Sequence, residues 1–302
     1  MNLSRLNVNL CGLSLETPFI LASGILDQNG YTMQRILKEG AAAVVTKSVG
    51  MVPRNGYAPP IVFPGDGYLL NAVGLSNPGI DKIGTEVKIA SEAGKPIIGS
   101  IFGKDAEEFS LLARKMESYG CAGVELNLSC PHVKGFGSEI GSDPDAVEEI
   151  VGDVKKSVKI PVFAKLSPNV TDIVEIAKAA DRADALVLVN TLRGMAIDIF
   201  ARMPVLSNAY GGLSGRAIKP VGLRLVYEVK KETGKTIVGV GGISSAADAL
   251  EYVMAGSSSV QIGTAVMESG RAIFSSLSSE MISLMNRTGF DRITDAVGVA
   301  VK

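Results

Sequence analysis

The segment TIVGVGG, residues Thr236–Gly242, is a short run of apolar, largely β-branched residues that ends in two glycines. Seven other segments have the same form, and each is followed by a polar turn and then by a stretch of helical character. They read PFILASG (18–24), AVVTKSV (43–49), PIIGSIFG (96–103), GVELNLS (123–129), PVFAKLS (161–167), ALVLVN (185–190) and SVQIGT (259–264). Near-continuous apolar strands of this length are typical of parallel sheets that are covered on both faces.

Amphipathic helices are expected between these segments. Phe109, Leu112 and Met116 recur with the period of one helical face, while Asp143 and Pro144 suit the N-cap and the first position of another helix. Eight strands that alternate with helices predict an α/β protein, a (β/α)8 TIM barrel with inserted loops at its C-terminal face. An open doubly wound sheet is the alternative, but eight repeats exceed the about six strands usual for that fold.

The composition argues against several classes of protein. The length of 302 residues suits one large domain or two small ones, and the predicted barrel favours a single domain over residues 1–302. Hydrophobic residues make up 46% of the chain, enough for a sizeable core, and 20% charged residues are too few for a disordered chain. A formal net charge of −1 without a basic block argues against a nucleic-acid partner. The first residues lack a signal-peptide pattern, and no apolar run reaches the roughly 18 residues of a membrane span.

The three cysteines, Cys11, Cys121 and Cys130, are odd in number and far apart, so they predict neither a disulfide framework nor a CxxC metal pair. Because the chain has one histidine, a closed metal site is not expected. These features fit a protein of the reducing cytoplasm. Cys11 and Cys121 lie outside the predicted strand ends, where a buried structural role is the expectation.

Two segments interrupt the alternation of strands and helices. Gly50–Gly79 follows the second strand and is rich in glycine, proline and asparagine, and Thr191–Gly215 follows the sixth strand. Both are longer than ordinary connections, and loops of this length in compact domains usually have a function. Both are expected at the C-terminal rim of the barrel, where active sites of this fold lie. A structural excursion or a dimer contact is the alternative.

Polar residues follow the predicted strands at the ends that converge on the mouth of a barrel. Two of them are lysines, Lys47 and Lys165. Burying an ammonium group is costly unless it meets an anion, although an ion pair with a carboxylate at the rim would satisfy either lysine alone. Two lysines with glycines on the opposite strands favour an anionic ligand.

The last two strands end in residues that suit a phosphate. Gly241 and Gly242 follow the seventh strand, and Gly263 and Thr264 follow the eighth. Glycine lets backbone N–H groups approach a phosphate closely, and the N-terminus of a following helix adds partial positive charge. Barrels of this class commonly bind the phosphate of a cofactor or substrate at this position.

The stretch NLSCPHVKGFG, residues Asn127–Gly137, contains Cys130 and the chain's single histidine, His132. A thiol beside the mouth could act as a nucleophile or as a proton carrier. A Cys–His hydrolase is disfavoured because its histidine normally comes from elsewhere in the chain. The asparagines near the strand ends suit a planar, amide-bearing molecule, so a flavin with a pyrimidine-like substrate is preferred to a sugar phosphate. A binding module without turnover stays open.

Several motifs in the same order resemble those of the dihydroorotate dehydrogenases, and specifically of their NAD-linked class 1B. The resemblance runs through nearly the whole chain. Its most specific stretches are TKSV (46–49), NAVGLSNPG (71–79), NLSCP (127–131) followed by VKGFG (133–137), VNTLRGMAIDI (189–199) and GGLSGRAIKPVGLRLVYEV (211–229).

The resemblance implies an FMN-binding barrel, with one FMN per chain, that oxidises dihydroorotate to orotate in pyrimidine synthesis. Cys130 would be the base that removes the C5 proton, while the C6 hydrogen leaves as hydride to the flavin. The implied flavin contacts are Ser23, Lys47, Ser48, Ser100, Asn127, Lys165 and the backbone of Val189, with the phosphate at Gly215, Gly241, Gly242, Gly263 and Thr264. The implied substrate contacts are Lys47, Asn71, Ala72, Val73, Gly74, Leu75, Asn127, Asn190 and Thr191.

The sequence departs from the family pattern at two positions where the family often has asparagine, His132 and Ser100. The stretch SCPH is similar to the dihydropyrimidine dehydrogenases, which are the alternative. Class 1B also implies a partner subunit that carries FAD and a [2Fe–2S] cluster. This chain lacks the four cysteines that such a cluster needs, so the cluster is expected on the partner. The implied assembly is a heterotetramer of two catalytic and two electron-transfer subunits; a fumarate-linked homodimer is the other possibility.

Overall fold

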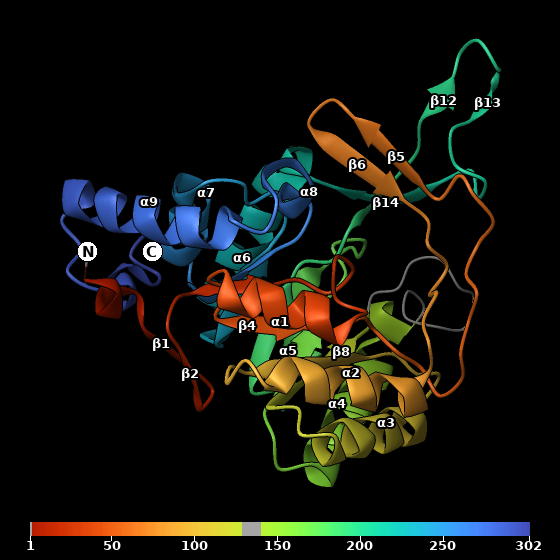
Figure 1. The fold of residues 1–302 in the computed structure, drawn as a ribbon, viewed down its shortest axis with the longest axis horizontal. Coiled ribbons are helices and arrows are strands. Elements are labelled where there is room, and N and C mark those ends of the chain that lie inside the picture. Colours follow the sequence, from red (N-terminus) through yellow and green to blue (C-terminus); the bar gives the residue numbers. More distant parts are fainter. Residues whose placement is uncertain (1, 129–139) are drawn as a thin grey trace.

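The computed structural model describes residues 2–128 and 140–302, and within them eight parallel strands close into a barrel (Figure 1). The barrel strands are β3 (Phe19–Leu21), β4 (Ala43–Val45), β7 (Ile97–Ile101), β8 (Gly123–Asn127), β9 (Val162–Lys165), β10 (Ala185–Leu188), β15 (Ile237–Val240) and β16 (Ser257–Ile262). They neighbour one another in chain order, and β16 pairs with β3 to close the ring. The predicted TIM barrel is therefore confirmed, and the open sheet is excluded.

Each barrel strand comes from one of the eight predicted segments. The strands are shorter than those segments at their C-terminal ends, so that polar residues such as Ser23 and Lys47 lie in the connections just beyond them. Neighbouring barrel strands are parallel, for example with Val187 beside Lys165 and Ile262 beside Leu21, and the pairing of β15 with β16 has one register shift, between Ile237 and Val238. All eight C-terminal ends consequently face the same side of the molecule.

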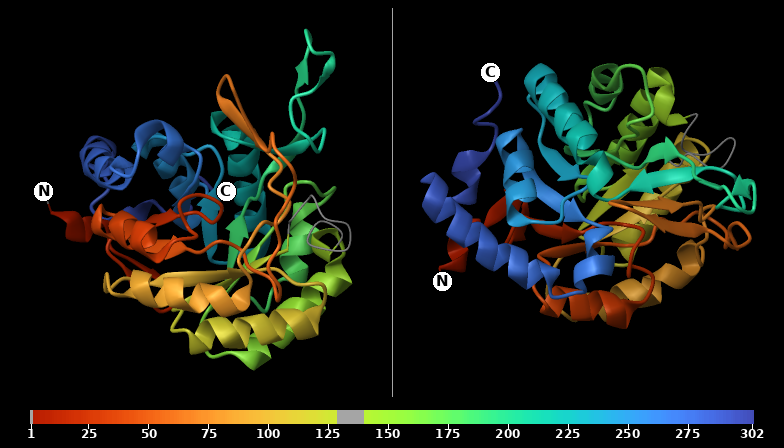
Figure 2. Two further views of the ribbon diagram at one scale, coloured as in Figure 1. Left: turned by 45° about the vertical axis from the view of Figure 1, so that its right-hand side comes forward. Right: turned by 90° about the horizontal axis from the view of Figure 1, so that it is seen from above.

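Helices surround the barrel, as the view from above shows (Figure 2). They are α1 (Gly30–Lys38), α2 (Ile80–Ser91), α3 (Ala106–Ser118), α4 (Pro144–Ser157), α5 (Ile173–Ala179), α6 (Lys219–Thr233), α7 (Ala246–Met254), α8 (Ala265–Ser269) and α9 (Ile273–Thr288), with 3₁₀ turns η1 (Leu3–Leu6), η2 (Ile140–Ser142), η3 (Arg216–Ile218) and η4 (Ile293–Ala296). In α3 the predicted stripe of Phe109, Leu112 and Met116 is fully buried. Asp143 caps α4 through the backbone N–H groups of Asp145 and Ala146, as predicted.

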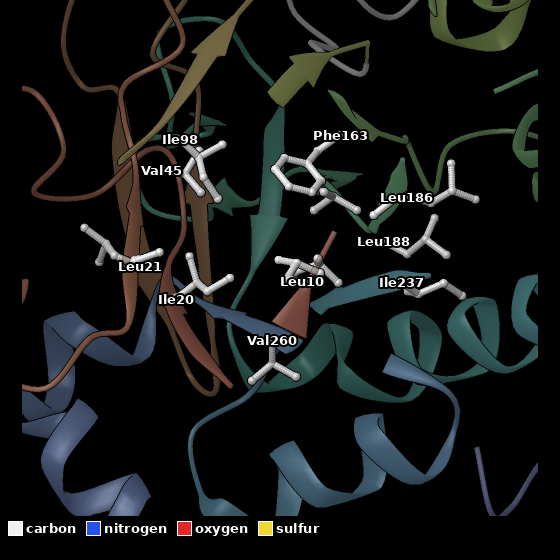
Figure 3. Close-up of a cluster of buried hydrophobic side chains, with 14 of the residues drawn as sticks. Leu10, Ile20, Leu21, Val45, Ile98, Phe163, Leu186, Leu188, Ile237 and Val260 are labelled. Carbon is white, nitrogen blue, oxygen red and sulfur yellow. The ribbon is translucent and has the colours of Figure 1, made fainter. Parts of the chain in front are cut away.

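The N-terminal hairpin of β1 (Val8–Leu10) and β2 (Leu13–Leu15) was not predicted from the sequence. Leu10 is fully buried and lies among side chains of the barrel strands, near Val260 and Ile237 (Figure 3). The hairpin thereby adds apolar side chains to the same core that the barrel strands build. No helix in residues 2–128 or 140–302 combines the length and the apolar character that crossing a membrane requires.

The two long segments predicted as loops form a second sheet at the rim. Its strands are β5 (Val62–Gly65), β6 (Tyr68–Asn71), β11 (Leu192–Gly194) and β14 (Gly211–Ser214), in the antiparallel order β11-β14-β6-β5. A further hairpin, β12 (Ile197–Asp198) with β13 (Met203–Pro204), projects away from the barrel (Figure 1). Because β14 pairs with β6, the sheet joins the two segments across the mouth.

Candidate active site

One cavity of about 340 Å³ lies at the C-terminal ends of the barrel strands. Strand ends form its inner wall, and the rim sheet contributes Val62, Leu69 and Asn71 from its own strands. This is the face on which TIM barrels build their active sites, and the volume falls within the range of small-ligand pockets.

Most of the predicted site residues line this cavity. They are Ser23, Lys47, Ser48, Asn71, Val73, Gly74, Leu75, Asn127, Lys165, Val189, Asn190, Thr191, Gly215, Gly241, Gly242, Gly263 and Thr264. Ser100 and Ala72 are fully buried behind the lining rather than in it. Cys130 and His132 lie outside the described residues. The structure thus brings together residues from both ends of the chain, while the role of each one stays a prediction.

A chain of polar side chains crosses the mouth from one strand end to the next. Ser48 Oγ shares hydrogen bonds with Ser23 Oγ at 3.3 Å and with Ser100 Oγ at 2.8 Å. Asn127 Nδ2 donates to Ser48 Oγ at 3.1 Å, and Asn190 Nδ2 donates to Asn127 Oδ1 at 3.3 Å. Ser100 therefore contributes indirectly, by holding the serine that does line the cavity. A network of this kind fixes the direction in which each amide presents its donor and acceptor.

Lys165 is the ion-paired lysine of the site. Its Nζ donates to Glu125 Oε1 at 3.2 Å and to Gln261 Oε1 at 3.3 Å, and Gln261 Nε2 donates to Glu125 Oε2 at 2.6 Å. The side chains of Lys165 and Glu125 are 7% and 1% exposed. The sequence left open that a carboxylate at the rim, rather than a ligand, pairs with this lysine. Lys165 does pair with a carboxylate, but that carboxylate belongs to Glu125 inside β8 and not to a residue of the rim.

Lys47 is placed differently. No carboxylate of the described residues lies within 4.0 Å of its ammonium group. Asp27 lies nearby, because its backbone C=O accepts the backbone N–H of Lys47 at 3.1 Å. Asp27 is 1% exposed, and its carboxylate accepts a hydrogen bond from the backbone N–H of Gly24. Burial raises the pKa of Asp27, and the positive charge of Lys47 opposes that rise only in part. The Lys47 ammonium thus remains available to an anionic group in the cavity.

The predicted phosphate site is a cradle of four glycines, Gly215, Gly241, Gly242 and Gly263, which we call the glycine cradle. Gly215, Gly241 and Gly242 have φ values of +90°, +128° and +71°, which are unfavourable for any residue with a side chain. A Cβ on Gly242 would lie 2.9 Å from Gly215 O and 2.8 Å from Lys219 N. The backbone segments at Gly215 and Gly242 are therefore packed against each other, and this packing requires glycine.

The cradle is held from behind by an ion pair that the sequence did not predict. Lys219 Nζ lies 2.6 Å from Asp248 Oδ1, while Asp248 Oδ2 accepts the backbone N–H groups of Ser244 and Ser245 at 3.0 and 2.9 Å. Burial disfavours the charged form of Asp248, but the hydrogen bonds from Lys219 and the two serines outweigh it, so its pKa is lowered. Asp248 thus ties the loop after Gly242 to the start of α7.

Several lining or supporting residues escaped the sequence analysis, namely Asp27, Glu125, Ser214, Arg216 and Gln261. A signal for two of them was present. Glu125 lies between the apolar Val124 and Leu126, and Gln261 lies between Val260 and Ile262, at alternate positions to Asn127 and Gly263. Because strand residues two apart face the same side, both point into the barrel beneath the mouth.

The two remaining cysteines take no part in the cavity. Cys121 is buried, and burial raises its pKa to about 12, so that it stays a thiol. Cys11 is half-buried, donates to Asp184 O at 3.3 Å and has a pKa raised by burial and by the charge of Asp184. The predicted burial is confirmed for Cys121, whereas Cys11 is only partly buried.

Comparison with known proteins agrees with this geometry. The sequence model of a family described as dihydroorotate dehydrogenase matches residues 5–285. A protein of Thermoplasma acidophilum is 61% identical over 300 residues, which cover 99% of this chain and 100% of the relative, and one of Methanocaldococcus jannaschii is 48% identical over 301 residues, 98% of each. Both are named dihydroorotate dehydrogenase B (NAD(+)), catalytic subunit. This chain therefore belongs to the dihydroorotate dehydrogenase family.

Proposed function

We propose that this protein oxidises dihydroorotate to orotate in pyrimidine biosynthesis, with FMN bound in the cavity at the strand ends. One observation carries the proposal: a single cavity gathers two lysines, a chain of asparagines and a glycine cradle from all around the barrel. The names of the related archaeal proteins support the same reaction.

The residues present fit an FMN. The glycine cradle offers backbone without side chains at one end of the cavity. Glycine lets backbone N–H groups approach a phosphate closely, and Arg216 adds a positive charge to the lining. At the other end, Lys165 and the serine–asparagine chain offer donors and acceptors for a polar ring.

We assign the flavin to Ser23, Lys47, Ser48, Asn127, Lys165 and the backbone of Val189, with its phosphate on the glycine cradle and Thr264, and with Ser100 supporting Ser48. When bound, FMN supplies a ring that accepts a hydride from the substrate. The ammonium of Lys165 is placed to stabilise negative charge on that ring, because it lines the cavity and is held by two acceptors from behind.

The substrate is assigned to other residues of the lining together with Lys47 and Asn127, which it shares with the flavin. Lys47 pairs with the substrate carboxylate, and Asn71, Asn127 and Asn190 meet its amide groups. Val73, Gly74, Leu75 and Thr191 complete this wall, and Ala72 supports it from behind. Cys130 is assigned as the base that takes the C5 proton. This assignment rests on the sequence, in which Cys130 follows Asn127 by three residues at the end of β8.

We also propose a partner subunit that carries FAD and a [2Fe–2S] cluster and passes electrons to NAD⁺, in a heterotetramer of two subunits of each kind. The relatives' designation as catalytic subunits supports such a partner. Three separated cysteines fit an enzyme of the reducing cytoplasm. Co-purification of this chain with an iron–sulfur flavoprotein is the expected result, and isolation from its own cells as a homodimer that reduces fumarate would contradict it.

An anaerobic titration tests the reaction. The purified chain is expected to be yellow, with about one FMN per chain, and dihydroorotate should bleach the flavin absorbance while dihydrouracil leaves it unchanged. Bleaching by dihydrouracil alone would instead assign a dihydropyrimidine dehydrogenase, the reading that the SCPH sequence at residues 129–132 favours. A colourless chain that takes up no flavin would contradict both.

A further inference from the structure

Three buried side chains at the bottom of the cavity form a closed ring of hydrogen bonds. We call Glu125, Lys165 and Gln261 the buried triad. Each member contacts the other two, at 3.2 Å between Lys165 and Glu125, 3.3 Å between Lys165 and Gln261, and 2.6 Å between Gln261 and Glu125. Glu125 lies on β8, Lys165 on β9 and Gln261 on β16, so the ring spans the inside of the barrel.

The chemistry of the three groups fixes the orientation of the Gln261 amide. An ammonium group can only donate and a carboxylate can only accept, so Gln261 must turn its oxygen to Lys165 and its NH₂ to Glu125. Both carboxylate oxygens are then used, Oε1 by Lys165 and Oε2 by Gln261. The ring has no second arrangement in which every contact pairs a donor with an acceptor.

The ring also separates the charges by depth. Lys165 and Gln261 line the cavity, whereas Glu125 does not. Lys165 has three N–H donors, of which two point to Glu125 and Gln261, and Gln261 has a second N–H beyond the one given to Glu125. A ligand in the cavity therefore meets N–H donors, while the carboxylate stays behind them at 1% exposure.

We propose that Glu125 and Gln261 are positioning residues that fix the polarity of the cavity floor, so that it presents only donors and stabilises negative charge on the flavin ring. This inference rests on the proposed function, because it concerns the ring that the cavity would hold. The proposal depends on the order of the two side chains, with the Glu125 carboxylate behind the lining and the Gln261 amide in it. It does not depend on the net charge of the triad, which an exchange of the two residues would leave unchanged.

The test exchanges the two residues in the double variant Glu125→Gln/Gln261→Glu. The exchange keeps the composition and the net charge, and again allows a complete ring, because the new amide can accept from Lys165 and donate to the new carboxylate. It moves the negative charge from behind the lining into the lining. The probe is sulfite, which adds to oxidised flavin and leaves a negative charge on the ring.

The exchanged variant should keep FMN and bind sulfite at least tenfold more weakly than the wild type. The reduction potential of the bound flavin should also fall, because the same negative charge in the lining opposes the electrons that reduction adds to the ring. Sulfite affinity and potential equal to those of the wild type would overturn the proposal, because a purely structural ring would be restored by the exchange.

A second variant covers the case in which the exchanged protein does not fold. Gln261→Met removes the front amide and leaves the Lys165–Glu125 pair in place, so the cavity loses a donor and faces the carboxylate less screened. Sulfite affinity should again fall, by roughly three- to tenfold. Unchanged or tighter sulfite binding in Gln261→Met would contradict the proposal.

The matched control is a glutamine–glutamate contact on the outside of the barrel. Gln34 Nε2 donates to Glu92 Oε2 at 3.2 Å, and both residues are remote from the cavity lining. The exchange Gln34→Glu/Glu92→Gln should leave sulfite affinity unchanged. A wild-type chain that binds no flavin would refute the proposed function and this inference together, whereas a normal wild type with unaffected triad variants would refute this inference alone.

Discussion

At the scale of single residues, the two lysines of the cavity show how much a neighbouring carboxylate decides. Lys165 is paired with Glu125 inside the barrel, so its position is fixed before any ligand arrives. Lys47 has no such pair among residues 2–128 and 140–302, and the nearby Asp27 instead accepts the backbone N–H of Gly24. The first lysine suits a resident cofactor, and the second suits a substrate that comes and goes.

Asp27 gives a prediction for stability against pH. The pKa of Asp27 is raised in the folded protein, so the fold favours the uncharged carboxyl group. The free energy of unfolding of the wild type should therefore fall as the pH rises from the ordinary Asp pKa of about 3.9 through the raised value. The variant Asp27→Asn has no titrating group at this position, so this fall in its free energy of unfolding does not occur. Its free energy of unfolding relative to wild type should therefore increase between pH 4 and pH 7, by about 1.4 kcal/mol for each unit by which the pKa is raised.

Urea denaturation of both proteins at several pH values measures this difference. A difference that stays constant would mean that folding leaves the pKa of Asp27 unchanged, and one that shrinks as the pH rises would mean that the fold favours the charged carboxylate. Either result would contradict the pKa direction given for Asp27.

Cys130 gives a prediction for the chemical step. Cys130→Ala should retain FMN but reduce it with dihydroorotate about 10² to 10⁴ times more slowly, the usual contribution of a general base. Because only the thiolate can take a proton, the wild-type rate should also rise with pH on the alkaline side of neutrality. Stopped-flow absorbance under anaerobic conditions measures both, with Cys11→Ser as the control thiol outside the cavity. Reduction at the wild-type rate in Cys130→Ala would remove this cysteine from the mechanism.

At the scale of elements, the barrel strands were predictable and the rim sheet was not. A strand buried on both faces reads as a continuous apolar run, and each of the eight runs became a strand. The rim strands are short and partly exposed, and β14 pairs with β6 from a distant part of the chain. The sequence does carry one local signal for this sheet, because Asp66-Gly67 is a dipeptide typical of two-residue hairpin turns, and it joins β5 to β6 with Gly65 opposite Tyr68.

The glycine cradle gives a prediction for this scale. Gly242→Ala places a Cβ 2.8 Å from Lys219 N and 2.9 Å from Gly215 O, so the two loops of the cradle must separate. FMN affinity should fall at least tenfold, measured by fluorescence titration of the chain freed of flavin. The control is Gly234→Ala after α6, which has a similar φ of +66° and no atom within 4 Å of the added Cβ.

In both variants an alanine must adopt a positive φ, which costs about 1 kcal/mol. Thermal unfolding should therefore show that this backbone strain destabilises the two variants by similar amounts. Only Gly242→Ala should lose FMN. Equal flavin affinity in Gly242→Ala and Gly234→Ala would exclude a phosphate from the glycine cradle.

At the scale of the whole molecule, barrel closure is what assembles the site. Ser23 and Thr264 come from opposite ends of the chain, yet they line the same cavity because β16 pairs with β3. The sequence could predict this convergence, since parallel strands in a closed barrel must end on one face. It could not predict which lining residues are supported from behind. Glu125 and Asp248 became visible as supports only once the structure placed them beside Lys165 and Lys219.

The rim sheet and its projecting hairpin also belong to this scale. The hairpin carries exposed apolar side chains, of which Phe200 is 91% and Ile199 is 74% exposed. Apolar groups gathered in this way are commonly covered by another protein surface. This hairpin is therefore a candidate contact surface for the partner subunit of the proposed assembly.

A crystal structure of the protein purified with its own flavin and soaked with orotate tests most directly whether one cavity serves both molecules. The predicted result is a single FMN in this cavity, with its phosphate against the glycine cradle and its ring beside Lys165, and with the orotate carboxylate at Lys47. Flavin bound elsewhere on the chain, or orotate bound away from Lys47, would contradict it.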